Sequence, residues 1–117
     1  GETSRDFCYI ANVVQTNILA ATTTNSSAIN RVYNVAVGER TTLNQLFATL
    51  REKLMKSTLG LTINDPVYKD FRPGDIRHSL ADITRAKSLL NYQPTHSIAD
   101  GLDEALTWYK QNLLQSN

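Results

Sequence analysis

The sequence predicts a small, helix-rich α/β domain with few short strands. Several long segments carry apolar side chains at the spacing of one helix face, whereas few stretches are rich in β-branched and aromatic residues. The chain has 117 residues, of which 41% are hydrophobic and 20% are charged, so it is large enough for one core but not for two. No internal repeat or linker divides it. We therefore expect a single domain over residues 1–117.

The first half of the chain is predicted to form a helix, a strand and a second helix. The helix spans residues 10–22, and its apolar residues are expected to form one buried stripe: Ile10, Val13, Val14, Ile18 and Ala21. A polar run over residues 22–30 ends it. The segment Val32–Gly38 (VYNVAVG) is predicted to be a buried strand because β-branched and aromatic residues dominate it.

The second predicted helix begins at Thr41 or Thr42, either of which can act as its N-cap. Gly60 is the expected stop. One face of this helix is apolar and is expected to pack inward: Leu43, Leu46, Phe47, Leu50 and Leu54. A short strand is then predicted over Pro66–Phe71, followed by a turn at Pro73-Gly74.

Two helices are predicted in the last third of the chain. Asp82 or Thr84 can cap a short helix that runs to Leu90, and Pro94 prevents its continuation. A longer amphipathic helix is predicted from Ser97 to Leu114. Its inward residues are expected to be Ile98, Leu102, Ala105, Leu106, Tyr109 and Leu113.

Composition excludes several functional classes. The net charge of +1 gives no field that would attract nucleic acid or a membrane surface, so neither is expected as a partner. No apolar run approaches the length of about 20 residues that a membrane span requires. A single cysteine, Cys8, cannot form an internal disulfide, which favours a reducing, cytoplasmic setting. The chain begins without Met, in what reads as a turn into a structured segment, and we interpret it as a fragment of a longer protein.

The stretch KDFRPGDIRHSLAD, residues 69–82, concentrates charge around a stiff turn. Arg72 and Arg77 flank the turn, and the planar guanidinium of arginine matches phosphate geometry. Gly74 permits a positive φ angle, and Asp75 can accept a hydrogen bond from a hydroxyl group or pair with an arginine. The alternative is a solvated turn with local ion pairs, which composition alone favours.

Arg5 lies more than sixty positions before this turn, next to Asp6. From the sequence, this pair can be a surface ion pair near a helix start, and spacing does not show whether Arg5 meets the turn. His78, His96 and Cys8 have no partners at the spacing of a metal or nucleophile site, so no metal site and no catalytic residue is assigned.

Three segments in order carry a family resemblance: RDFCYI, VYNVAVGERTTLNQL and RPGDIRHSLADITRAKSLLNYQP. Together they resemble the C-terminal third of extended short-chain dehydrogenases/reductases that act on nucleotide sugars. The similarity is greatest to the bacterial UDP-N-acetylglucosamine/UDP-N-acetylgalactosamine 4-epimerases of polysaccharide biosynthesis. The resemblance implies a UDP-sugar-binding C-terminal domain over residues 1–117. It also implies an N-terminal Rossmann domain that binds NAD and lies outside the chain, and a homodimeric full-length enzyme.

The resemblance also implies roles for individual residues. Arg5 and Arg72 are similar in position to two arginines that grip the diphosphate, and Asp75 to the acid that binds the ribose. Ser79 takes the place of a residue whose size gates the sugar pocket, so a serine there favours N-acetylated substrates.

The chain departs from the family in its catalytic and cofactor motifs. It contains no Tyr-x-x-x-Lys pair, and its five glycines are scattered rather than gathered in a glycine-rich turn. We therefore expect the chain to be inactive alone. Two alternatives stay open from the sequence: a lobe of a related nucleotide-sugar decarboxylase or dehydratase, and a stand-alone interaction module.

Overall fold

The computed structural model describes residues 1–113. Over this range the chain forms four α-helices, one 3₁₀ helix and a two-stranded sheet. In chain order they are β1 (Ser4–Arg5), α1 (Ile10–Thr22), η1 (Ser26–Ala28), β2 (Thr41–Thr42), α2 (Leu43–Ser57), α3 (Thr84–Leu90) and α4 (Ile98–Leu113). The predicted helix-rich α/β fold is confirmed. Leu114, the predicted end of the last helix, lies outside the described residues.

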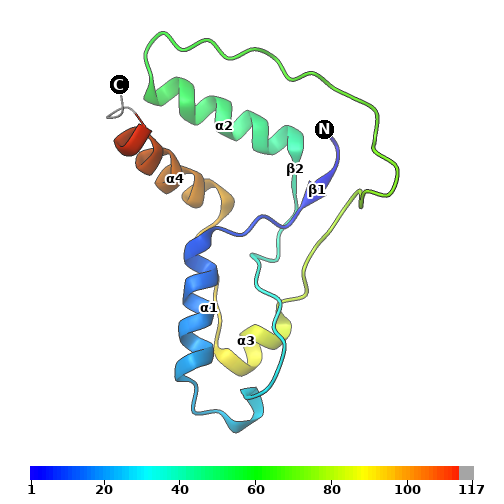
Figure 1. The fold of residues 1–117 in the computed structure, drawn as a ribbon, viewed down its shortest axis with the longest axis vertical. Helices are drawn as coiled ribbons and strands as arrows, with labels where there is room; N and C mark the ends of the chain where they lie inside the picture. The colour runs from blue at the N-terminus through cyan, green and yellow to red at the C-terminus, as the bar shows by residue number, and fades with distance from the viewer. Residues whose placement is uncertain (114–117) are drawn as a thin grey trace.

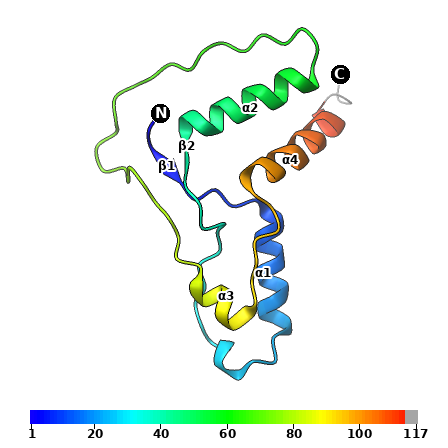
Figure 2. The same cartoon turned by 180° about the vertical axis from the view of Figure 1, so that it is seen from behind.

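The elements form two groups joined by the small sheet (Figure 1; the view from behind is Figure 2). Helices α2 and α4 lie side by side at one end, and α1, α3 and η1 pack together at the other. Residues 58–77 form a long loop around the outside of the first group. The radius of gyration is 17.5 Å, against about 13 Å for a compact domain of this length. The described chain is therefore elongated and thin.

The core is small and lies in the second group. It consists of Ala36, Ile83, Ala86 and Tyr92, with Leu19 and other half-buried residues packed against it. The Tyr92 hydroxyl donates a hydrogen bond of 2.7 Å to the main-chain oxygen of Ala36. This bond satisfies the polar end of a side chain that is fully removed from solvent.

Helix α1 has its predicted bounds, but the prediction of a buried apolar stripe is wrong. Its buried residues are Asn12 and Thr16. Four residues of the predicted stripe are exposed instead: Ile10 at 62%, Val14 at 50%, Ile18 at 58%, and Ala21. The side of the helix with Asn12 and Thr16 is buried toward α3 and the residues before α4, and the side with Ile10, Val14 and Ile18 stays exposed.

The two predicted strands are also wrong. Neither Val32–Gly38 nor Pro66–Phe71 forms a ladder with another segment among residues 1–113. Val32 is 81% exposed, and Ala36 is the buried residue of its segment. A β-rich sequence forms a strand only beside a hydrogen-bonding partner. The observed strands, β1 and β2, have two residues each, which is too short to produce an alternation in the sequence.

The helix boundaries follow the predicted caps only in part. Thr42, one of the two predicted N-caps, caps α2 through a capping box with Gln45. The helix ends at Ser57 with the extended Thr58 as its C-cap, so the predicted stop Gly60 lies beyond the helix end, where it adopts a positive φ of +76°. The N-cap of α3 is Ile83 and not the predicted Asp82 or Thr84, although an Asp82 carboxylate oxygen accepts the Thr84 N–H at 2.9 Å. The hydrogen bonds from Thr84 hold the pKa of Asp82 below its usual value.

The apolar faces of α2 and α4 pack against each other without full burial. On α2, Leu46, Phe47, Leu50 and Leu54 are half-buried, whereas Leu43 is exposed. On α4, the predicted inward residues Ile98, Leu102, Ala105 and Leu106 are half-buried. Tyr109 is exposed, so its predicted inward position is wrong, and the side chain of Leu113 lies outside the described part. None of the helices over residues 1–113 has the length and apolar character required to cross a membrane.

Candidate functional site

An open groove of about 820 Å³ lies between the small sheet, the start of α2 and the long loop. Its charged lining consists of three arginines, one lysine and three acids: Arg5, Arg72, Arg77, Lys69, Glu2, Asp70 and Asp75. Asn44 and several aromatic residues, among them Phe71, complete the lining. The predicted site residues Arg5, Arg72 and Asp75 therefore share one surface.

Strand β1 is the element that brings the two motifs together. On one side it pairs antiparallel with β2, with Ser4 opposite Thr42 and Arg5 opposite Thr41. On its other side, Ser4 forms a parallel bridge with His78. The Ser4 N–H donates to the Arg77 oxygen at 2.9 Å, and the Ser79 N–H donates to the Ser4 oxygen at 3.2 Å. These bonds join residues more than seventy positions apart, which sequence spacing does not reveal.

The Arg5 side chain is oriented by main-chain oxygens. Its Nη1 donates to the oxygen of Ser4 at 2.8 Å and to the oxygen of Arg77 at 3.2 Å. Within the described range Arg5 forms no ion pair with a carboxylate. A guanidinium has five N–H donors, so the remaining donors are available to an anion in the groove.

Arg72 and Asp75 form a local ion pair across the Pro73-Gly74 turn. The Arg72 Nε lies 3.2 Å from an Asp75 carboxylate oxygen, and the Asp75 N–H donates to the Arg72 oxygen at 3.2 Å. Gly74 adopts a φ of +85°, the conformation for which glycine is suited. The Arg72 side chain is 85% exposed. The turn is therefore solvated with a local ion pair, as the alternative interpretation expected, and the paired arginine also lines the groove.

Ser79 lies at the edge of this site. Its main chain is bound to β1, but its side chain is outside the set of residues that line the groove. The structure therefore brings together three of the four predicted residues and places the fourth beside them.

Asp6 has a structural role that the sequence interpretation missed. Its carboxylate accepts the N–H groups of Val37 and Gly38 at 3.0 Å each, and that of Ala81 at 3.4 Å. The interpretation of Arg5-Asp6 as a surface ion pair is wrong, because Asp6 binds main-chain donors instead. These bonds attach two distant segments to the residue that follows Arg5. No periodicity in the sequence indicates them.

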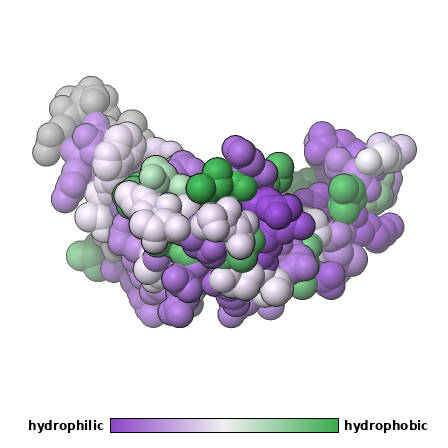
Figure 3. Space-filling view, turned by 90° about the horizontal axis from the view of Figure 1, so that it is seen from below, coloured by the Kyte–Doolittle hydropathy of each residue, from purple (hydrophilic) through white to green (hydrophobic). Residues whose placement is uncertain are grey.

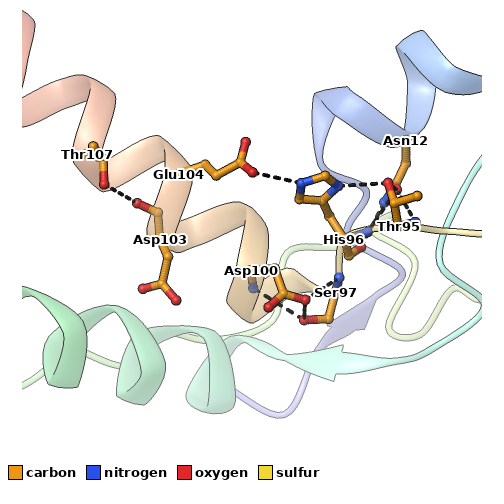
Figure 4. A network of polar contacts seen from close by, with 8 residues as sticks. All are labelled: Asn12, Thr95, His96, Ser97, Asp100, Asp103, Glu104 and Thr107. Atoms are coloured by element: carbon orange, nitrogen blue, oxygen red, sulfur yellow. Dashed lines mark hydrogen bonds and ion pairs between the residues drawn. The ribbon is translucent and has the colours of Figure 1, made fainter.

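A second polar network joins α1 to α4 (Figure 4). The buried Asn12 side chain donates to the His96 oxygen at 2.8 Å and accepts the N–H groups of Thr95 and His96. The His96 Nε2 lies 2.8 Å from a Glu104 carboxylate oxygen. Hydrogen bonds from His96 and Tyr9 lower the pKa of Glu104. Every member of this network has a hydrogen-bonding partner inside the protein. We therefore interpret the network as a structural link between α1 and α4.

The remaining reactive side chains do not form a site. Cys8 is half-buried, and burial raises the pKa of its thiol, which opposes nucleophile formation. His78 contacts the Ser4 hydroxyl at 2.9 Å. Across residues 1–113, no three side chains of the metal-binding types converge. A second hollow of about 560 Å³ is lined by residues of α2 and α4, but its Lys53 is paired with Asp103 at 2.6 Å.

Known proteins provide a comparison for this arrangement. No protein-family model matches the chain. Its curated relatives include nucleotide-sugar 4-epimerases, and the chain spans about a third of the length of the relatives it matches.

Three solved structures have similar folds. The UDP-glucose 4-epimerase of Thermotoga maritima, solved with UDP-glucose, shares 36% identity at a TM-score of 0.78, over 97% of this chain and 33% of its own. The UDP-N-acetylglucosamine 4-epimerase of Methanobrevibacter ruminantium, in complex with UDP-N-acetylmuramic acid, shares 36% identity at a TM-score of 0.78, over 95% of this chain and 33% of its own. The UDP-glucuronic acid 4-epimerase of Bacillus cereus, solved with UDP-glucuronic acid and NAD, shares 29% identity at a TM-score of 0.77, over 95% of this chain and 33% of its own. The resemblance indicated by the sequence motifs is confirmed.

Proposed function

Because the chain matches nucleotide-sugar 4-epimerases along nearly its whole length, we propose that it is the UDP-sugar-binding lobe of such an enzyme. The carrying observation is the convergence of Arg5 with the Arg72–Arg77 turn at one groove, through main-chain bonds of β1. Arginine is always charged and binds phosphate oxygens in pairs, so a groove with several arginines suits a diphosphate. Arg5 and Arg72 bind the diphosphate in this proposal, and Asp75 binds the ribose.

NAD is the proposed cofactor of the longer enzyme but not a ligand of this chain. The similar epimerase of Bacillus cereus was solved with NAD. The residues present here do not fit a dinucleotide site, because the five glycines lie at positions 1, 38, 60, 74 and 101 and none forms a glycine-rich turn between a strand and a helix. A Tyr-x-x-x-Lys pair is also absent. The lobe alone is therefore proposed to be catalytically inactive.

We propose that a Rossmann domain of the same protein covers part of the surface of the lobe. The core is small, and apolar side chains stay at the surface on the face seen in Figure 3. The apolar stripe of α1 is exposed, and the extended segment 32–37 has no strand partner among the described residues. Such surfaces count against a stand-alone module. The homodimer implied by the resemblance stays a prediction.

The proposed substrates are UDP-N-acetylglucosamine and UDP-N-acetylgalactosamine, used in polysaccharide biosynthesis. Ser79 supports this choice, since a small side chain beside the groove leaves room for an N-acetyl group. One similar enzyme acts on UDP-N-acetylglucosamine, and another acts on UDP-glucose.

A titration of the ¹⁵N-labelled chain with UDP, followed by NMR, tests the proposal. We expect weak binding, with shifts confined to residues around Arg5, Arg72 and Asp75, because part of the pocket belongs to the proposed partner domain. Arg5→Met should abolish these shifts, whereas the matched Arg31→Met, an exposed arginine in the other group, should leave them unchanged. Shifts elsewhere, or no shifts, would contradict the site, and tight binding would contradict an incomplete lobe.

Substrate choice has its own arm in the same experiment. Ser79→Tyr should weaken the binding of UDP-N-acetylglucosamine while leaving that of UDP-glucose unchanged. An equal loss for both sugars would contradict the proposed role of Ser79.

A further inference from the structure

Arg77 is a groove residue to which no role was assigned from the sequence. Its main-chain oxygen accepts hydrogen bonds from both the Ser4 N–H, at 2.9 Å, and Arg5 Nη1, at 3.2 Å. The backbone of Arg77 is thus attached to the strand that carries Arg5, and its position relative to Arg5 is held by two bonds.

The Arg77 side chain lies over the ring of Phe71, with its guanidinium carbon 4.5 Å from the ring centroid. Stacking on an aromatic face restrains a guanidinium while its N–H donors, which lie in the guanidinium plane, stay accessible at its edges. Both residues line the groove. The contact therefore fixes the position of the Arg77 guanidinium and leaves all of its N–H donors available to bind an anion.

The three groove arginines differ in how their charge is balanced. Arg72 is paired with Asp75, whereas Arg5 and Arg77 form no ion pair with any carboxylate of residues 1–113. Two unneutralised cations on adjoining segments repel each other, and a bound dianion relieves that repulsion. The unbalanced positive charge of the groove arginines is thus on Arg5 and Arg77.

We propose that Arg77 is a ligand-contacting residue of this groove and binds the phosphates of a nucleoside diphosphate together with Arg5. The inference rests on the proposed function and adds a third arginine to its site. Phe71 has the role of a positioning residue that holds the Arg77 guanidinium.

The test is an NMR titration of the full 117-residue chain with three probes: UDP, inorganic pyrophosphate and uridine. Arg77→Met should weaken the binding of UDP and pyrophosphate by roughly tenfold, as expected for the loss of one hydrogen-bonded charge, and should leave uridine binding unchanged. Arg77→Lys should lie between wild type and Arg77→Met, because it keeps the charge but loses the planar fork. Phe71→Leu should weaken UDP binding less than Arg77→Met does.

Arg31→Met is the matched control, since it removes the same charge from an exposed site away from the groove. Added salt should weaken UDP binding to the wild-type chain more steeply than to Arg77→Met. The dispersion of the amide spectrum shows whether each variant is folded. If Arg77→Met does not fold, the comparison with wild type is made with Arg77→Lys.

The outcomes separate the inference from the proposed function. If Arg5→Met weakens UDP binding and the Arg77 variants do not, Arg77 is no ligand contact and the proposed site stands without it. Equal losses of UDP affinity in Arg77→Met and Arg31→Met would show that the effect comes from long-range charge, and would contradict a direct contact between Arg77 and the ligand. If UDP perturbs no groove resonance in the wild-type chain, the proposed function and the inference both fail.

Discussion

Tyr92 shows at the scale of one residue how burial and hydrogen bonding act on the same side chain. It is fully buried at the centre of the core, and its hydroxyl donates to the Ala36 oxygen at 2.7 Å. Burial, followed by the nearby Cys8, raises the pKa of Tyr92 to about 12. A phenolate at this position would lose both solvation and the donated hydrogen bond. Tyr92 thereby attaches the extended segment around Ala36 to the residues that follow α3.

The raised pKa of Tyr92 predicts a loss of stability at high pH. In the unfolded chain a tyrosine loses its proton near pH 10, whereas in the folded chain Tyr92 keeps it up to about pH 12. The contribution of Tyr92 is therefore fully present below about pH 10, and the free energy of unfolding falls between about pH 10 and 12. Urea unfolding at a series of pH values measures this fall.

Tyr92→Phe is the control for this prediction. It should be less stable at neutral pH by about 1 kcal/mol, for the lost hydrogen bond, and should show a shallower fall above pH 10. Burial also raises the pKa of Tyr9, so part of the fall should persist in the variant. An equally steep fall in both proteins would rule out Tyr92 as its source.

At the scale of the elements, the arrangement depends on where helices begin and how closely they approach. Thr42 and Gln45 begin α2 with a capping box directly after β2, so this helix starts at the groove. Asn12 connects α1 to the residues before α4 with hydrogen bonds to Thr95 and His96. At this joint Gly101 of α4 lies against Tyr9, which precedes α1.

Gly101→Ala should destabilise the chain although alanine favours helices. A methyl group at this position would lie 2.6 Å from the Tyr9 Cβ, too close for any carbon contact. An exposed glycine-to-alanine change in a helix stabilises by about 1 kcal/mol, whereas overpacking of this kind costs about 1 to 3 kcal/mol. We expect a lower urea midpoint for Gly101→Ala.

Adding Tyr9→Gly tests the cause of that loss. Glycine at position 9 removes both the ring and the Cβ that lies 2.6 Å from the new methyl group, so in the Tyr9→Gly background Gly101→Ala should no longer destabilise. Equal losses in the two backgrounds would show that contact with Tyr9 is not responsible.

At the scale of the whole molecule, the described chain has more surface than a domain of its length requires. It is 55 Å long and 20 Å thick, and the apolar stripe of α1 faces solvent. A helix is normally amphipathic because its apolar side packs on a core. In α1 the polar Asn12 and Thr16 are buried instead, which is the pattern of an element with neighbours on both sides. This supports the proposed covering domain.

Val14→Ser combined with Ile18→Ser tests whether this stripe contributes to the lobe itself. Since both side chains are half-exposed or more, the free energy of unfolding should change by less than about 1 kcal/mol. The fluorescence of a dye that binds exposed apolar surface should decrease relative to wild type. A large loss of stability would show that the stripe packs within the lobe and needs no partner. Leu19→Ser, next to the core, is the destabilising control.

The local features of this protein were predictable because their causes lie within a few residues. The capping box at Thr42, the start of the short helix after Asp82 and the 3.6-residue periodicity of α1 are all encoded by neighbours along the chain. The turn at Pro73-Gly74 was predictable for the same reason, since Gly74 tolerates its positive φ. The motif order indicated the nucleotide-sugar epimerases, which the similar structures confirm.

The errors concern features whose cause lies elsewhere in space. Val32–Gly38 has the composition of a strand but has no hydrogen-bonding neighbour in the described chain, and composition does not carry that information. The stripe of α1 was predicted correctly as a stripe and wrongly as buried, because periodicity defines a face without naming what covers it.

The sequence by itself determined the helices, the N-cap of α2, the epimerase resemblance and which side chains have the chemistry to bind a diphosphate. Tertiary structure alone decided that Arg5, Arg72 and Arg77 share a groove, that Asp6 binds main-chain N–H groups, and that Arg72 is neutralised while Arg77 is not. The physical reason is range. Capping and periodicity act over one or two helical turns, whereas the bonds between Ser4 and residues 77–79 close a loop of more than seventy residues.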